Sequence, residues 1–384
     1  MLVVGLSLFI FSWSFGDGFH EEMINNAVET HMAHIQIHKK GFVDNPILKN
    51  RIADPMPIIE AVKKTPKVIS YAPRVKCQGL ASTAYASSNV SIVGIDPTLE
   101  SKLTNIQDKL LSGRYINVKA KDEAMIGIKL AEKLELDLGD KIIVTGQSLK
   151  GDLKAEAFKV VGIYRTSDPS LDKYFVYIPI STAQKFFAMG TSINEVAIDV
   201  KKDRDIKSAL IFLKKNINNP DLEILSWREV NPALVQFIQL DDISLYITVF
   251  IVAVVIALEV YNTLLMSILE RTKEFGVMLA MGTKPSGIVA VVVFEAIFMG
   301  AVTILFGCTI GGLSSLYFVY NPLDFSFVAE GFEAFAVSPL INFSLGPKHF
   351  IVTSAIMFLI VIISSLYPAI KASRLKPVEA IRFL

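Results

Sequence analysis

The sequence predicts a membrane α-helical protein with four transmembrane helices and a large extracytoplasmic α+β domain. Long apolar runs occupy 243–269, 288–320 and 350–367, and a shorter one occupies 1–16. A bilayer span needs about 20 mostly apolar residues. Between the runs at 1–16 and 243–269, residues 17–242 alternate short strand patterns with helical patterns. The chain is 52% hydrophobic yet 20% charged, which fits spans combined with a sizeable soluble domain.

Composition excludes several classes of function. The net charge of +1 indicates no nucleic-acid partner. The two cysteines, Cys77 in a polar region and Cys308 in an apolar run, predict no disulfide framework. The sequence has neither a G-x-x-x-x-G-K-[ST] phosphate loop nor a G-x-S-x-G nucleophile motif. We therefore expect no enzyme activity, no catalytic residues and no cofactor, and any ATP-driven work must use a partner's nucleotide site.

The first apolar run, 1–16, is short for a span, and two interpretations stay open. It is either a first transmembrane helix, possibly truncated at its start, or a signal peptide. The run has no basic region before it and no clear small-residue cleavage site, which favours the span.

The extracytoplasmic domain is predicted at 17–242 from two β-α-β patterns. Their segments are 34–39, 55–65 and 67–83 in one half, and 194–200, 205–217 and 222–227 in the other. Together they predict a ferredoxin-like layer, with a mixed β-rich subdomain of about 88–190 inserted between the halves. Within the insert we expect helices at 97–111 and 181–187, the second with Ser181 as its N-cap.

Basic residues set the predicted topology. They gather in the segment 270–287 and in the C-terminal tail, at Arg271, Lys273, Lys284, Lys371, Arg374, Lys376 and Arg382. The loop before the last span has acids and a single lysine, Lys348. Positive residues mark cytoplasmic loops. We therefore predict that 270–287 and the tail are cytoplasmic, and that the C-terminal part, 243–384, carries the last three spans.

Three features inside the apolar runs and the outer domain have competing interpretations. Glu259 and Glu295 are costly in lipid and are either functional or hydrogen-bonded within the bundle. The small residues Gly300, Gly307 and Gly311 allow close helix packing, between subunits or within one. His31, His34 and His38 suggest a metal, but no cysteine or acid completes a ligand set at a suitable spacing. We expect no metal site.

Two long motifs carry a resemblance to a known family. They are ERTKEFGVMLAMGTKPSGI at 270–288 and YPAIKASRLKPVEAIRFL at 367–384. Both resemble the FtsX/MacB-type permease core of ABC transporters. Motifs in the outer domain are similar to those of the lipoprotein-releasing LolC/LolE/LolF branch: HIQIHKKGF, VGIDP, LLSGRYI, IGIKLAEKLELDLGDKI, VVGIY and SWREVNPAL. One departure is that the cytoplasmic lead-in and longer first span of that family are largely missing.

The resemblance implies a mechanotransmitting (type VII) permease subunit in a bacterial inner membrane. It implies an ATPase partner (LolD-like), a second permease that is identical or paralogous, lipoprotein cargo, and a periplasmic chaperone (LolA-like). Alternatives within the resemblance are MacB-like export of peptides, antibiotics or toxins, and FtsX-like signalling to cell-wall hydrolases.

The segment 270–287 is the predicted coupling helix for the ATPase. The predicted coupling residues are Arg271, Glu274, Phe275, Gly276, Met278, Leu279 and Gly282. Phe275, Met278 and Leu279 recur at helical spacing and would fill an apolar groove, while Arg271 and Glu274 set orientation. The alternative is an interfacial segment whose charges face lipid headgroups.

Lipidated cargo needs an apolar surface in the outer part of the protein. Candidates are Phe15 and Phe19 and the loop 325–345, with Phe325, Phe327, Phe332, Phe335 and Phe343. Ordinary anchoring of aromatic residues at the membrane interface is the alternative.

Overall fold

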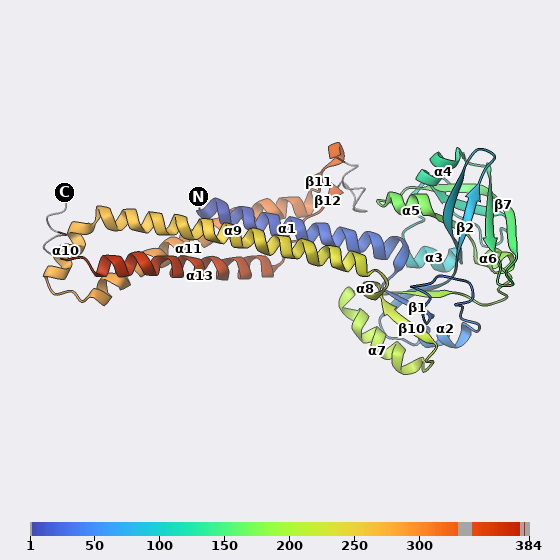
Figure 1. Ribbon diagram of the computed structural model, residues 1–384, viewed down its shortest axis with the longest axis horizontal. Helices are drawn as coiled ribbons and strands as arrows, with labels where there is room; N and C mark the ends of the chain where they lie inside the picture. The colour runs from blue at the N-terminus through green and yellow to red at the C-terminus, as the bar shows by residue number, and fades with distance from the viewer. Residues whose placement is uncertain (1, 329–339, 377–379, 381–384) are drawn as a thin grey trace. The chain divides into compact units, whose positions relative to one another are not determined.

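The computed structural model describes residues 2–328, 340–376 and 380 (Figure 1). The chain divides into two units, which are described separately. The first comprises Met1–Glu21, Phe237–Phe325 and Leu340–Leu384, and the second comprises Glu22–Gln236 with Ser326–Pro339. Phe332 and Phe335, and the end of the tail motif at 377–379 and 381–384, lie outside the described residues. The sequence-derived boundaries at 16/17 and 242/243, and the insert of about 88–190, stay predictions.

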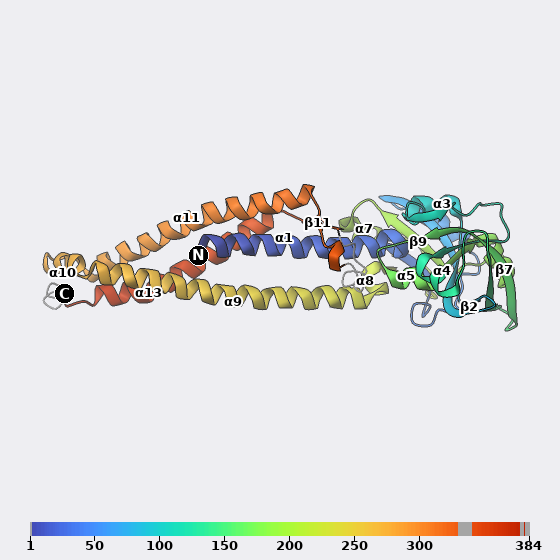
Figure 2. The same ribbon diagram turned by 90° about the horizontal axis from the view of Figure 1, so that it is seen from above.

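The first unit is built from long apolar helices that run alongside one another (Figure 2). They are α1 (Leu2–Ala27), α9 (Pro232–Glu270), α11 (Pro285–Tyr320) and α13 (Pro347–Ser373). Within the described residues these four helices are long and apolar enough to cross a membrane. The prediction of four transmembrane helices is confirmed.

The helices extend beyond the apolar runs that predicted them. α9 starts at Pro232 and not near residue 243, and α1 continues to Ala27, followed by a π-helical turn, η1 (Val28–Met32). Hydrophobicity reports only the part of a helix that lipid can surround, whereas backbone hydrogen bonding continues into polar sequence. A short helix, α10 (Thr272–Ala280), connects α9 to α11. A two-stranded ribbon, β11 (Leu323–Asp324) with β12 (Leu340–Ile341), lies between α11 and α13.

The second unit contains a large mixed sheet, which has ten strands in the described part of the chain. Nine of them follow the order β10-β1-β9-β2-β3-β8-β5-β7-β4, and the tenth, β6, pairs with β2 and β7. Its strands are β1 (Ile35–Lys39), β2 (Val68–Ser82), β3 (Ser87–Ile95), β4 (Leu110–Gly113), β5 (Glu123–Gly127), β6 (Lys141–Gln147), β7 (Leu153–Tyr164), β8 (Phe175–Pro179), β9 (Glu195–Val200) and β10 (Leu222–Ser226). Its helices are α2 (Met56–Lys63), α3 (Pro97–Leu103), α4 (Ile128–Leu134), α5 (Pro169–Tyr174), α6 (Ile180–Phe186), α7 (Ile206–Asn216) and α8 (Trp227–Val230).

The ferredoxin-like layer is the part β10-β1-β9-β2. Every neighbouring pair in it is antiparallel, and α2 and α7 are the crossovers of its two β-α-β halves. Ile35 and Ile37 on β1 are fully buried in the same core as Ile58 of α2 and Leu213 of α7. The opposite face of β1 carries Gln36 and His38, because side chains alternate along a strand. The predicted fold class is confirmed.

Two details of the insert differ from the prediction. The helix expected over 97–111 ends at Leu103, and residues 110–113 instead form β4 against β7. Local periodicity does not report a pairing with a strand this distant in sequence. Ser181 is not an N-cap, because α6 starts one residue earlier, at Ile180, with Pro179 in the cap position and no side-chain cap.

Candidate functional site

The segment that connects α9 to α11 is shaped by its own turn residues. α9 ends at Glu270 and α10 ends at Ala280. Gly282 adopts φ +93°, a left-handed conformation that side chains disfavour. Pro285 then opens α11, where its missing N–H costs nothing. The sequence therefore builds a short helix held between two long ones.

Arg271 and Glu295 together connect α9, α10 and α11. Its Nε donates to Glu274 Oε2 at 2.8 Å, and its Nη1 lies 3.4 Å from Glu295 Oε2 on α11. The guanidinium also lies 5.3 Å from the ring centre of Phe275. Ser267 of α9 donates to Glu295 Oε1 at 3.1 Å. Glu295 is thus hydrogen-bonded within the bundle, which was one of its two predicted interpretations.

Burial divides the predicted coupling residues into two groups. Phe275 is 1% exposed and packs with Ile268, Ile288 and Ala372, and Gly276 is also buried. Met278 and Leu279 are half-buried against the same cluster. Phe275 therefore fills a space within its own chain, and the expectation that it fills a groove on a partner does not fit its burial.

The exposed face of α10, continued by Met281 directly after the helix ends, carries different residues. Lys273, Glu274, Val277 and Met281 are exposed, with Val277 at 45% and Met281 at 76%. Residues three and four apart share a helix face, so Glu274, Val277 and Met281 form one stripe. Sequence reasoning selected Phe275, Met278 and Leu279, which form the more buried side of α10, because both stripes have helical spacing. Only the packing of α11 and α13 distinguishes them.

The small residues bring helices of the same chain together. A Cβ at Gly311 would lie 2.9 Å from the carbonyl oxygen of Ser7 on α1, and one at Gly307 would lie 2.7 Å from Leu6. Gly300 faces Val361 of α13, 3.3 Å from a Cβ built there. Of the two predicted uses, these positions serve packing within one subunit. Glu259 is half-buried on α9.

Polar contacts join α1 to α9 and α13 near Asp17 and His20 of α1. Asp17 accepts from Lys348 Nζ at 2.5 Å and from His349 Nε2 at 3.1 Å, both on α13. His20 Nε2 lies 2.8 Å from Asp241 Oδ2 on α9. Sequence reasoning missed these pairs, because partners more than 200 residues apart leave no local pattern.

Aromatic rings cluster near the same end. Phe343 packs against Phe11, Phe15 and Phe318 at 4.8, 5.5 and 5.2 Å between ring centres. Phe15 also contacts Phe325 and Phe19 at 6.0 and 6.3 Å. Most of the predicted cargo aromatics that are described therefore contact one another, while Phe327 is 82% exposed.

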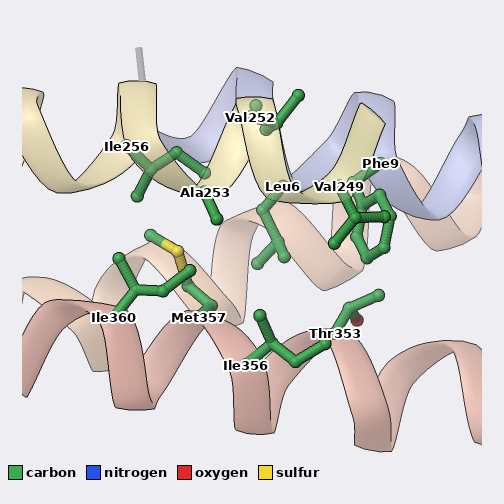
Figure 3. A pocket seen from close by; sticks show the side chains of 11 residues that line it. Leu6, Phe9, Val249, Val252, Ala253, Ile256, Thr353, Ile356, Met357 and Ile360 are labelled. Atoms are coloured by element: carbon green, nitrogen blue, oxygen red, sulfur yellow. The ribbon is translucent and has the colours of Figure 1, made fainter. Parts of the chain in front are cut away.

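A narrow apolar cavity lies between α1, α9 and α13 (Figure 3). It measures about 20 Å³, and Figure 3 shows Leu6, Ile256 and Met357 pointing toward one another across it. Thr353 also lines it, but its hydroxyl donates to the carbonyls of its own helix. A space of this size holds about one water molecule and is too apolar to hydrate well.

The three histidines considered for a metal each have a separate partner. His34 contacts Asp199, His38 Nε2 lies 3.1 Å from Glu195 Oε2, and His31 Nδ1 lies 3.3 Å from Tyr177 Oη. Within the described residues, no group of three or more histidine, cysteine or acidic side chains is arranged to hold a metal.

Four transmembrane helices, a short helix between the second and third, and a large mixed-sheet domain define a multi-pass membrane protein with a large domain outside its spans. The chain matches the MacB-like periplasmic core domain over residues 1–210 and the FtsX-like permease C-terminal domain over 246–377. It therefore belongs to the FtsX/MacB-type permeases of ABC transporters.

Curated relatives cover most of the chain at low identity. The lipoprotein-releasing system transmembrane protein LolC of Neisseria meningitidis is 20% identical over 100% of this chain and 92% of its own length. An uncharacterized ABC transporter permease of Methanocaldococcus jannaschii is 27% identical over 70% of this chain and 64% of its length. The macrolide export ATP-binding/permease protein MacB of Agrobacterium fabrum is 23% identical over 99% of this chain, which spans 57% of that relative.

Among solved structures, the periplasmic region of MacB from Actinobacillus actinomycetemcomitans aligns with 56% of this chain and 97% of its own, at 19% identity and a TM-score of 0.38. The extracellular domain of YknZ aligns with 50% of this chain and 98% of its own, at 17% identity and a TM-score of 0.36.

Proposed function

We propose that this chain is the permease subunit of a mechanotransmitting ABC transporter that releases lipoproteins from the inner membrane. A separate ATPase subunit binds at α10, and a second permease subunit completes the transporter. Closure of the ATPases moves α10, and the long helices carry that movement outward. The observation that supports this most is the position of α10, a short helix with an exposed stripe held between two long helices.

The geometry of α10 suits force transmission. Its buried side, through Phe275, packs on residues of α9, α11 and α13, so a push on α10 acts on all three helices. Its exposed side offers Val277 and Met281 for an apolar groove, with Lys273 and Glu274 beside them. Arg271 then holds α10 against α11 through Glu295. The coupling role of Arg271, Glu274, Gly276, Met278, Leu279 and Gly282 remains a proposal.

Lipoprotein release is preferred over MacB-like export because the alignment covers 92% of LolC but only 57% of MacB. The half-buried Phe15 and Phe19, which pack beside the buried Phe343, would offer acyl chains an apolar surface at the outer end of the bundle. MacB-like export is the second candidate, supported by the alignment to MacB over 99% of this chain.

Site-specific photo-crosslinking in native membranes tests the ATPase contact. A photoreactive residue at Val277 or Met281 should capture an ABC ATPase, identified by mass spectrometry, and the same residue at buried Phe275 should not. Glu274→Lys should lower ATP-dependent release of acylated protein while membrane insertion stays intact. Capture that is equal at Phe275 and Met281, or unchanged release in Glu274→Lys, would remove the docking hypothesis. If the cargo is not acylated but the ATPase is captured, MacB-like export replaces lipoprotein release.

A further inference from the structure

α9 is the span that its own chain covers least. Of its most apolar stretch 11% is buried, against 22–33% in the spans formed by α1, α11 and α13. The buried side chains of α9 are Ile256, Val260, Leu264 and Ile268, which recur every four residues and lie along one side of the helix. The opposite side of α9 therefore faces away from the helices with which it packs.

That opposite side carries a seven-residue repeat, which we call the Asn262 face. Its residues, all exposed, are Ser244, Thr248, Ile251, Val255, Leu258, Asn262 and Leu269. Successive members lie three, four or seven residues apart, so they share one face of the helix. A repeat of seven residues is the pattern by which two helices pack along a left-handed seam, in water and in membranes.

Asn262 is a polar residue inside this apolar span. Charged residues begin at Glu270, and Asn262 lies eight residues before it, or about 12 Å along the helix, which places it within a hydrocarbon layer of about 30 Å. The neighbouring Thr263 is also exposed, but its hydroxyl donates to the carbonyl oxygen of Glu259 at 2.8 Å. Among the described residues, no hydrogen bond reaches the Asn262 amide. An unpaired amide in hydrocarbon is costly, so this side chain calls for a partner outside its own chain.

The chemistry of an amide favours a second copy of the chain as that partner. An amide carries both donors and an acceptor, so two Asn262 side chains related by a twofold axis can hydrogen-bond to each other. Lipid tails offer no such group. A single asparagine on the seam of two helices also fixes their register. The glycines that could serve a contact between copies, Gly300, Gly307 and Gly311, already face α13 or α1 of the same chain.

We propose that the Asn262 face of α9 is the surface through which two copies of this chain pair. The two α9 helices run parallel, and their Asn262 amides hydrogen-bond to each other. A twofold axis along the membrane normal brings each residue of the face opposite its counterpart, so Val255 meets the Val255 of the second copy. This inference rests on the proposed function, which requires a second permease subunit, and it identifies that subunit as an identical chain.

Disulfide trapping in native membranes tests the contact, with two differently tagged full-length copies expressed together. Val255→Cys should give a covalent dimer that carries both tags, because a disulfide needs Cα atoms about 4.4–6.8 Å apart and facing positions of such a seam approach that closely. Val254→Cys is the matched control. Val254 is the adjacent valine and is also exposed, at 44% against 58%, but it points about 100° away around the helix. The unmodified chain, with Cys77 and Cys308, gives the background.

A second measurement asks whether Asn262 holds the two copies together. The full chain is labelled, reconstituted into proteoliposomes and diluted with lipid, and association is followed by energy transfer between labelled copies. Asn262→Leu should weaken association roughly 3- to 30-fold, the range expected for a hydrogen bond between membrane helices. Thr263→Val is the matched control and should leave association unchanged, because the Thr263 hydroxyl is bonded within its own helix.

Several outcomes would overturn the proposal. They are a Val255→Cys dimer no stronger than background, equal yields from Val254→Cys and Val255→Cys, and equal association of Asn262→Leu and Thr263→Val. A Val255→Cys adduct with a different permease would also overturn it. ATPase capture at Met281 is measured in the same membranes. Capture without the dimer rejects this interface and leaves the proposed function in place, whereas a dimer without capture rejects ATPase docking alone.

Discussion

Arg74 is the side chain whose removal should cost the second unit most. It is 1% exposed, and it donates to Glu100, to Glu195 and, at 2.6 Å, to the carbonyl oxygen of His31 in η1. Arg74→Met leaves Glu100 buried without its cationic partner, deprives Glu195 of one of its two cations, and leaves the His31 carbonyl without this donor. Breaking a buried ion pair from one side costs roughly 3–5 kcal/mol.

That loss should be visible as a fall in melting temperature. For a domain of about 150–250 residues, 1 kcal/mol corresponds to about 2–4 °C, so Arg74→Met should lower Tm by roughly 6–20 °C. The assay is thermal unfolding of the full chain in detergent, followed by near-UV circular dichroism. Arg114→Met is the control, because Arg114 pairs with Glu123 but its side chain is 56% exposed. An exposed pair contributes only about 0–1 kcal/mol.

A double variant separates charge from packing. Arg74→Met combined with Glu100→Leu replaces the pair by apolar side chains and should recover part of the lost stability. The reasoning would be refuted if Arg74→Met lowered Tm no more than Arg114→Met does. It would also be refuted if the double variant were less stable than Arg74→Met alone.

Two further predictions concern helix packing and pH. Gly311→Ala should destabilise the bundle by about 1–3 kcal/mol, because the added Cβ would lie 2.9 Å from the carbonyl oxygen of Ser7. Gly16→Ala is the control: a Cβ there would have nothing within 4 Å, so this change should be neutral or stabilising. Chemical denaturation in detergent measures the difference, and equal effects at the two glycines would contradict it. Burial, with Lys76 and Arg74, lowers the pKa of His31 well below 6.5. The unfolded state then binds more protons than the native state as pH falls below about 6.5, so stability should fall there, and His31→Phe should remove that slope. Burial raises the pKa of Asp172 to about 6, so Asp172 changes stability with pH in the opposite direction. The pH dependence of stability is therefore compared between the unmodified chain and His31→Phe. An unchanged slope between pH 6.5 and 5 in His31→Phe would contradict the prediction.

The sequence by itself determined the fold class and the family. The apolar runs determined the four transmembrane helices, because a bilayer requires uninterrupted apolar length. Period-two and helical patterns determined both β-α-β halves, because each buries one face against the other. Turn residues such as Gly282 and Pro285 determined the ends of α10 and α11, since their backbone constraints act locally.

Only the tertiary structure decided which side chains are free to act. Phe275 and Met281 look equivalent in a sequence, yet one is 1% and the other 76% exposed, because α11 and α13 cover one side of α10. The pairs Asp17–His349 and His20–Asp241, and the network of Arg74, Glu100 and Glu195, join residues far apart in the chain. His38 is polar in the pattern and looks solvent-facing, but the structure buries it beside a cavity. Local patterns fix which face of an element is apolar, whereas the packing of other elements decides which of its polar and apolar groups remain available.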